Sequence, residues 1–171
     1  MNAVIENILT RRSFRAYKDT PVSYDDLQII LECALHAPSA MNKQTWHFTA
    51  LTDKDEIAAL AKAVGNTLRR DDYDFYKPAA LIITSNDPEC VYGKEDNACA
   101  MENIMLAAHA LGMGSVWINQ LNGFSETPGI KEALESLDLP EGYVVYGCAA
   151  IGYPESAELA EKQVLGSYDI K

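Results

Sequence analysis

One long segment, Asp96–Leu111, limits how the rest of this chain can fold. Its apolar residues cover nearly the whole circumference of a helix, whereas a helix on the surface of a domain carries them along one stripe. Such a helix is buried on most sides. A chain of 171 residues builds about one domain and has little other material to cover this helix. The segment therefore indicates packing against a second copy of the chain.

The remaining elements alternate between helices and strands. Helices are predicted from about Asn2 to Thr10, from Ser23 to Ala37, from Asp53 to Asn66 and from Thr127 to Leu137, and strands over Trp46–Leu51, Ala79–Thr84, Ser115–Ile118 and Tyr143–Ile151. Ser23 and Asp53 each precede an acidic residue at capping-box spacing. Gly65–Asn66 is expected to close the third helix, and Pro128 is expected at the first position of the helix capped by Thr127. The pattern predicts an α+β layer protein with a single domain over residues 1–171.

The charge balance excludes two classes of partner. With 14 Lys+Arg against 25 Asp+Glu, the formal net charge is −11, which disfavours nucleic acid and anionic membranes. No apolar run approaches the ~20 residues of a membrane span, and we expect no signal peptide. The four cysteines are scattered without a C-x-x-C pair. We therefore expect a reduced, cytoplasmic protein without a metal site.

Three of the arginines fall within five positions, in Arg11-Arg12-Ser13-Phe14-Arg15. Guanidinium groups present a planar fork of donors that suits a phosphate, and the acidic chain elsewhere makes the cluster unusual. The alternative is that arginines at a helix end only offset the helix dipole. On the residues alone both interpretations stay open.

The connection from Pro38 to Trp46 contains a rigid proline, a hydroxyl and two carboxamides. Connections between a helix and a strand often carry binding residues, but taken alone this one is better explained as an ordinary helix–strand turn. The three histidines are dispersed and are interpreted as structural, so no catalytic side chain is assigned. Gly112-Met113-Gly114 follows a helix and lacks a third glycine, which excludes a Rossmann loop.

Taken in order, three motifs resemble the nitroreductase superfamily of FMN-dependent, NAD(P)H-using oxidoreductases. They are the arginine cluster, the run Ala37-Pro38-Ser39-Ala40-x-Asn42-x-Gln44-x-Trp46-x-Phe48, and a small-residue helix leading into Leu111–Ile118. The resemblance covers about Val4 to Pro154. It implies a three-layer α+β fold with a mixed central sheet of four to five strands flanked by helices. It also implies a homodimer that packs around the long helix.

The resemblance also implies which residues bind FMN. Arg11, Ser13 and Arg15 match positions that hold the phosphate, the ribityl chain and the pyrimidine edge, and Arg12 matches a neighbouring contact. Pro38, Ser39, Ala40 and Asn42 match a loop that reaches FMN bound mainly to the other subunit. Trp117, Ile118, Asn119 and Gln120 match the segment beside the flavin N5. Asn66, and one of Arg69 or Arg70, match further contacts to the pyrimidine edge.

Two departures from the family pattern bear on function. The tail 155–171 carries Lys162 where relatives have a basic pair for the phosphate, and no large insertion follows Ile118 to cover the substrate. The implied activity is hydride transfer from NADH or NADPH through FMN to nitroaromatics, quinones or similar small acceptors, with ping-pong turnover. The alternative is an FMN-binding redox sensor or flavin-handling protein with little turnover. The tail is also a candidate to reach the partner subunit.

Overall fold

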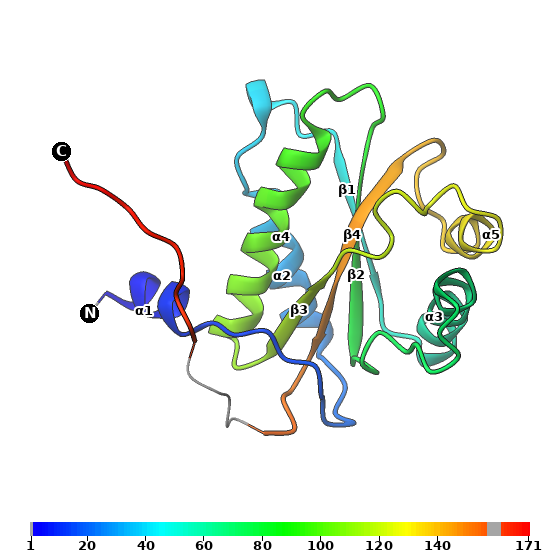
Figure 1. Ribbon diagram of the computed structural model, residues 1–171, viewed down its shortest axis with the longest axis horizontal. Helices are drawn as coiled ribbons and strands as arrows, with labels where there is room; N and C mark the ends of the chain where they lie inside the picture. Colours follow the sequence, from blue (N-terminus) through cyan, green and yellow to red (C-terminus); the bar gives the residue numbers. More distant parts are fainter. Residues whose placement is uncertain (1, 157–161) are drawn as a thin grey trace.

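A four-stranded antiparallel sheet separates two groups of helices in the computed structural model, which describes residues 2–156 and 162–171 (Figure 1). The strand order is β1-β2-β4-β3. The strands are β1 (Trp46–Leu51), β2 (Ala80–Asn86), β3 (Gly114–Ile118) and β4 (Val144–Gly152), and the helices are α1 (Ala3–Thr10), α2 (Tyr24–Leu35), α3 (Lys54–Leu68), α4 (Gly93–Ala110) and α5 (Ile130–Glu135), with a short 3-10 turn, η1 (Ala40–Asn42). The predicted α+β class is confirmed.

Both faces of the sheet are covered, which makes the fold three-layered. In β2, Leu81 and Ile83 point into a core shared with α3 and α5, whereas Ala80 and Ile82 point into a second core shared with α2 and α4. All residues of β2 are buried, and its apolar part, Ala80–Ile83, is the continuous run expected of a strand covered on both faces. The two helix layers lie on opposite sides of the sheet in Figure 1.

The predicted helix starts at Ser23 and Asp53 are confirmed by their hydrogen bonds. The amide of Asp26 donates to Ser23 Oγ at 3.1 Å, and the Ser23 hydroxyl donates back to Asp26 Oδ2 at 2.7 Å. Asp53 Oδ1 accepts from the amides of Asp55 and Glu56 at 2.8 and 3.1 Å. Both caps use amides that the helix leaves unpaired in its first turn.

The predicted end of the third helix is wrong. α3 continues past Asn66 to Leu68, and Arg69, in the left-handed conformation at φ 55° and ψ 45°, is its C-cap. Gly65 lies inside the helix, at a position where the backbone of Arg70 packs against it. A Cβ at this position would lie 2.6 Å from the carbonyl oxygen of Arg70, and the Arg70 amide donates to the Gly65 carbonyl at 2.8 Å.

The predicted start of the last helix is also wrong. Thr127 and Pro128 form a turn, in which the Thr127 carbonyl accepts from the amides of Ile130 and Lys131 at 3.1 and 2.9 Å. Gly129 follows with φ 87°, a left-handed conformation that a right-handed helix does not admit. α5 therefore begins only at Ile130.

The four strands pair antiparallel, so the sheet is less mixed than the resemblance implies. Among the described residues, parallel pairing is confined to one bridge between Ser13 and Ser115. That bridge adds the chain after α1 to the free side of β3. Across the described residues, no helix combines the length and apolar character needed to cross a membrane.

α4 is incompletely covered within one chain. Eight of its residues, including Met101 and Ile104, are buried, but Cys99 and Ala110 are exposed. α1 lies against α4, with Asn7 Nδ2 donating to the Leu106 carbonyl at 2.9 Å, yet no residue of α1 is itself buried. Its apolar side chains, such as Val4 at 67% exposed, face outward. A single chain therefore leaves a continuous part of α1 and α4 without cover.

Candidate functional site

The arginine cluster lies alongside β3. Ser13 forms a parallel bridge with Ser115, and the amide of Phe14 donates to the Ser115 carbonyl at 3.0 Å. Because the bridge is parallel, the chain from Ser13 to Arg15 runs in the same direction as that from Ser115 to Trp117. The structure therefore brings together the first and third motifs of the sequence.

Two aromatic side chains hold this segment against the sheet. A Cβ on Gly114 would lie 2.7 Å from the ring of Phe14, and one on Gly152 would lie 3.0 Å from the ring of Tyr17. The Tyr17 hydroxyl lies 2.8 Å from the Phe14 carbonyl and 3.1 Å from that of Ala150. Burial raises the pKa of Tyr17, so this donor keeps its proton. Phe14 and Tyr17 thus anchor a segment whose Ser13 and Arg15 remain exposed.

The first two arginines have different surroundings. Arg12 Nη1 donates to the carbonyls of Leu9 and Arg11, both at 2.9 Å, and so satisfies carbonyls at the end of α1. Arg11 Nε lies 3.6 Å from Glu102 Oε1, but it is buried and has no hydrogen-bond partner among the described residues. Helix-end electrostatics therefore explains Arg12. Arg11 pairs with Glu102 only through this ion pair, and its guanidinium charge can attract an anion such as a phosphate.

Arg15 faces a strained turn. Its guanidinium carbon lies 5.9 Å from the centre of the Tyr76 ring, within reach of a weak cation–π contact. Phe75, Tyr76 and Lys77 have φ values of 52°, 67° and 47°, and left-handed residues other than glycine cost roughly 1–2 kcal/mol each. Strain of this kind clusters at ligand sites. The buried side chain of Phe75 (1% exposed) fixes the turn to the core.

His109 lies beside the arginine cluster at the end of α4. The Thr10 hydroxyl donates its proton to the Glu6 carbonyl at 2.7 Å. The same hydroxyl oxygen lies 2.9 Å from His109 Nε2. Because the hydroxyl has only one proton, His109 Nε2 is the donor in this second bond. Partial burial, and then the charges of Arg11 and Arg12, lower the pKa of His109 below its ordinary value. The lowered pKa favours the uncharged ring at neutral pH.

The second motif lies at the opposite end of α4 (Figure 1). The amide of Ala40 donates to Asp96 Oδ1 at 2.9 Å, in the first turn of α4, whereas Thr10 meets His109 in its last turn. At ~1.5 Å per residue, the stretch from Asp96 to His109 is about 20 Å long. Within one chain, the Pro38–Asn42 turn and the arginine cluster do not form a common site.

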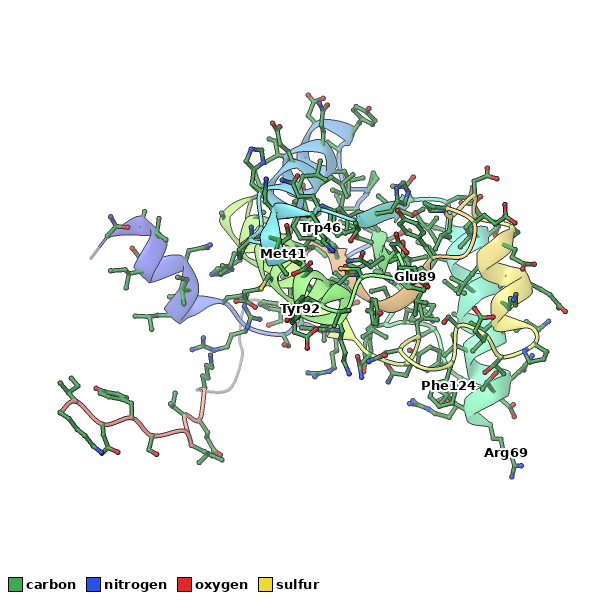
Figure 2. All side chains as sticks on the ribbon, turned by 90° about the horizontal axis from the view of Figure 1, so that it is seen from above. Met41, Trp46, Arg69, Glu89, Tyr92 and Phe124 are labelled. Atoms are coloured by element: carbon green, nitrogen blue, oxygen red, sulfur yellow. The ribbon has the colours of Figure 1, made fainter. Side chains whose placement is uncertain are left out.

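The turn around η1 is exposed and strained. Met41, Asn42 and Gln44 have φ values of 54°, 55° and 51°. Pro38 and Asn42 are exposed, Ser39 and Ala40 are half-buried, and Met41, at 74% exposed, projects from the surface near Trp46 (Figure 2). The turn therefore presents backbone and small polar groups to whatever packs against this face.

The predicted residues after β3 are partly accessible. Trp117 is 39% exposed, Ile118 is buried, Asn119 is exposed and Gln120 is half-buried. The indole of Trp117 packs over Gly147, where a Cβ would lie 2.9 Å from Trp117 Nε1. This close approach orients Trp117 on the sheet surface beside the arginine segment.

The other predicted contacts are placed differently. Asn66 is exposed on α3 and lines, together with Arg70 and Tyr73, a cavity of about 940 Å³ between α3 and the chain after Tyr17. Arg69 points outward from the end of α3 (Figure 2), so Arg70 is the better placed of the pair. Lys162 is exposed in the tail. Of the acidic run 155–161, the part from residue 157 on lies outside the described residues.

Four residues that organise this site were not assigned to it from the sequence: Gly114, Tyr17, Glu102 and Asp96. Gly114 lies within the third motif and Tyr17 lies two residues after the arginine cluster. A glycine in a strand can mark a close approach of another segment, so Gly114 could have been recognised. In the sequence, Glu102 and Asp96 are indistinguishable from other polar residues of the same helix. No local pattern identifies their partners, which are distant in the chain.

Comparison with solved structures defines the class of the fold. A crystal structure of a nitroreductase with bound FMN from Bacteroides fragilis NCTC 9343 superposes with a TM-score of 0.89 at 37% identity, covering 100% of this chain and 98% of that one. The three-layer α+β arrangement is therefore that of a nitroreductase.

Sequence comparisons identify the family. The nitroreductase family model matches residues 8–80 and 76–153. A protein of Archaeoglobus fulgidus, provisionally named an NADH dehydrogenase/NAD(P)H nitroreductase, is 35% identical over 162 residues, 91% of this chain and 87% of its own length. The FMN reductase (NAD(P)H) of Bacillus subtilis is 28% identical over 171 residues, 90% of this chain and 67% of that protein. The chain belongs to the nitroreductase family.

Proposed function

We propose that the protein is an FMN-dependent oxidoreductase that takes hydride from NADH or NADPH and reduces nitroaromatics, quinones or similar small acceptors by ping-pong turnover. The observation that carries this proposal is the placement of Arg11, Ser13 and Arg15 on a segment held against β3. Arg11 Nε has an ion pair with Glu102 at 3.6 Å but no hydrogen bond among the described residues. The relatives add support, since one binds FMN and another is named an FMN reductase.

The residues of the site fit the chemical groups of FMN. Arg11 offers a guanidinium charge for the phosphate, Ser13 a short exposed hydroxyl, and Arg15 a charge for the pyrimidine edge. FMN, when bound, supplies the hydride chemistry, and the protein binds, orients and tunes it. The remaining proposed contacts are Arg12, Pro38, Ser39, Ala40, Asn42, Asn66, Trp117, Ile118, Asn119, Gln120 and Lys162.

We also propose a homodimer with FMN sites at the subunit interface. Pro38–Asn42 and Arg11–Arg15 lie at opposite ends of α4, so the turn of one chain meets the arginine cluster of another only if two α4 helices pack against each other. The uncovered apolar part of α1 and α4 supports this packing. In the tail 155–171, Leu165 and Ile170 are 91% and 90% exposed, and a partner subunit would cover them. The whole chain, 1–171, would form the single domain of each subunit.

Two measurements test the proposed function. The purified protein should be yellow and release FMN on denaturation, and it should oxidise NADH or NADPH when a nitroaromatic or a quinone is added. A protein that is colourless and does not bind added FMN contradicts the proposal. Full FMN occupancy with negligible turnover would instead favour a flavin-binding sensor, which the isolated and exposed Lys162 motivates as the second candidate.

A further inference from the structure

We infer that Asp96 is the positioning residue that fixes the Pro38–Asn42 turn, and through it the contact of this turn with the flavin of the partner subunit. The inference rests on the proposed function for its consequence, but its structural part stands on this chain alone. Asp96 lies 56 positions from Ala40 in sequence, and its carboxylate accepts the Ala40 amide at 2.9 Å.

Most hydrogen bonds of the Pro38–Gln44 turn join residues within the turn, and few join it to the rest of the fold. The Asn42 amide donates to the Ser39 carbonyl at 3.0 Å, and Gln44 Nε2 donates to Asn42 Oδ1 at 2.7 Å. These bonds begin and end within the turn. Among the hydrogen bonds of the described residues, the one from Ala40 to Asp96 joins residues 38–44 to α4.

Asp96 is suited to this task. It is 4% exposed, so its carboxylate is shielded from water and needs protein donors. Cys90 Sγ, 3.9 Å from Oδ2, supplies a weak donor to the second oxygen. Its place in the first turn of α4 adds the favourable interaction of an acidic group with the positive end of a helix. The carboxylate therefore joins the turn to the start of α4.

The left-handed residues in the turn explain why such a link is needed. Met41, Asn42 and Gln44 occupy a conformation that persists only where the surroundings enforce it. Without the bond to Asp96, we expect the turn to relax toward ordinary conformations. Its backbone would then no longer be presented in one geometry to the partner subunit.

Paired variants test this link. Asp96→Ala removes the acceptor, and Ala40→Pro removes the donor. Proline is tolerated at position 40 because this is the first residue of η1. The preceding Ser39, at φ −129° and ψ 150°, already has the extended conformation that a following proline requires. Asp96→Asn keeps an acceptor oxygen. Glu95→Gln is the matched control, because Glu95 is an exposed acidic residue in the same first turn.

We expect Asp96→Ala and Ala40→Pro each to weaken FMN binding about tenfold or more, Asp96→Asn to weaken it less, and Glu95→Gln to leave it unchanged. The double variant should lose no more than the worse single variant, since both remove one bond. Hydrogen exchange at the Asn42 and Lys43 amides should accelerate in Asp96→Ala, while exchange at Leu60 and Val64 in α3 stays constant.

The outcomes separate the two proposals. Unchanged exchange in the turn, or additive losses in the double variant, would overturn the role of Asp96. If wild type binds no FMN while exchange still accelerates in Asp96→Ala, the proposed function fails and the link stands. Should Asp96→Ala not fold, Ala40→Pro gives the same test from the donor side.

Discussion

Arg12 Nη1 donates to the carbonyl of Leu9 at 2.9 Å, and through this bond the guanidinium folds back over the end of α1. The neighbouring Arg11 keeps a buried Nε without an acceptor among the described residues. Two adjacent arginines thus have different tasks. Arg12 satisfies carbonyls at the end of α1, whereas Arg11 has an ion pair with Glu102 and is the proposed phosphate contact.

Arg11→Ala should therefore weaken FMN binding more strongly than Arg12→Ala does. Loss of a charge-assisted phosphate contact costs about 1.5–3 kcal/mol, or roughly a 10- to 150-fold loss in FMN affinity by fluorescence titration. Arg12→Ala should instead lower the free energy of unfolding by about 1 kcal/mol with a smaller change in affinity. Equal affinity losses in both variants would contradict this division of roles.

Gly114→Ala should displace the arginine segment. The new methyl would lie 2.7 Å from the Phe14 ring, and overpacking of this kind costs about 1–3 kcal/mol. We expect lower stability in urea and weaker FMN binding together. Glu141→Ala, at an exposed position before β4, is the control and should change neither quantity.

The pKa of His109 should report on the charge next to it. Arg11→Leu should raise that pKa toward 6.5, because one of two nearby cations is removed. A bound FMN phosphate should also raise it, because its negative charge offsets the charge of the arginines. NMR titration of the ring protons measures both shifts. Lys131→Gln, on α5, should leave the titration unaltered, and a fall in the pKa on adding FMN would place the phosphate elsewhere.

The same group predicts how stability varies with pH. Because the pKa of His109 is lower in the folded protein than the ordinary 6.5, the unfolded chain binds more protons below pH 6.5. Its contribution to stability is complete above that pH and is lost as the pH falls through the folded pKa. In His109→Gln, urea unfolding should show a weaker dependence on pH below 6.5. An unchanged slope would contradict this prediction.

Cys99→Glu tests the dimer. Cys99 is exposed on α4 in the single chain, so a charge there should not disturb the fold of a subunit, but it would be buried between two packed α4 helices at high cost. We expect sedimentation equilibrium to report a folded monomer without FMN. Glu132→Lys on α5 should remain dimeric. A Cys99→Glu dimer with normal FMN content would exclude α4 as the interface.

Sequence patterns predicted the elements that local chemistry determines. Ser23 and Asp53 cap helices because the required amides lie two or three residues away, and β2 is recognisable as an unbroken apolar run. The patterns failed where the deciding atom lies outside the local segment. Gly65 resembles a helix end, but it is needed because the Arg70 carbonyl packs against it.

The candidate site shows the same limit. The motif order led to Arg11, Ser13 and Trp117, and the structure places the first motif beside the third. The sequence offered no means of separating Arg12 from Arg11, because their difference lies in the direction of each side chain. Nor could it pair Ala40 with Asp96, which requires knowledge of where η1 lies relative to α4.

The distance between the two binding motifs along α4 also has a genetic consequence. In a dimer with shared sites, each flavin draws its arginines from one chain and its turn from the other. A chain carrying Arg11→Ala and a chain carrying Ala40→Pro should then complement each other, because in the mixed dimer one site receives both lesions and the other receives neither. Co-expression of the two variants should give protein with higher FMN affinity and activity than either variant alone, whereas placing both lesions in the same chain should not.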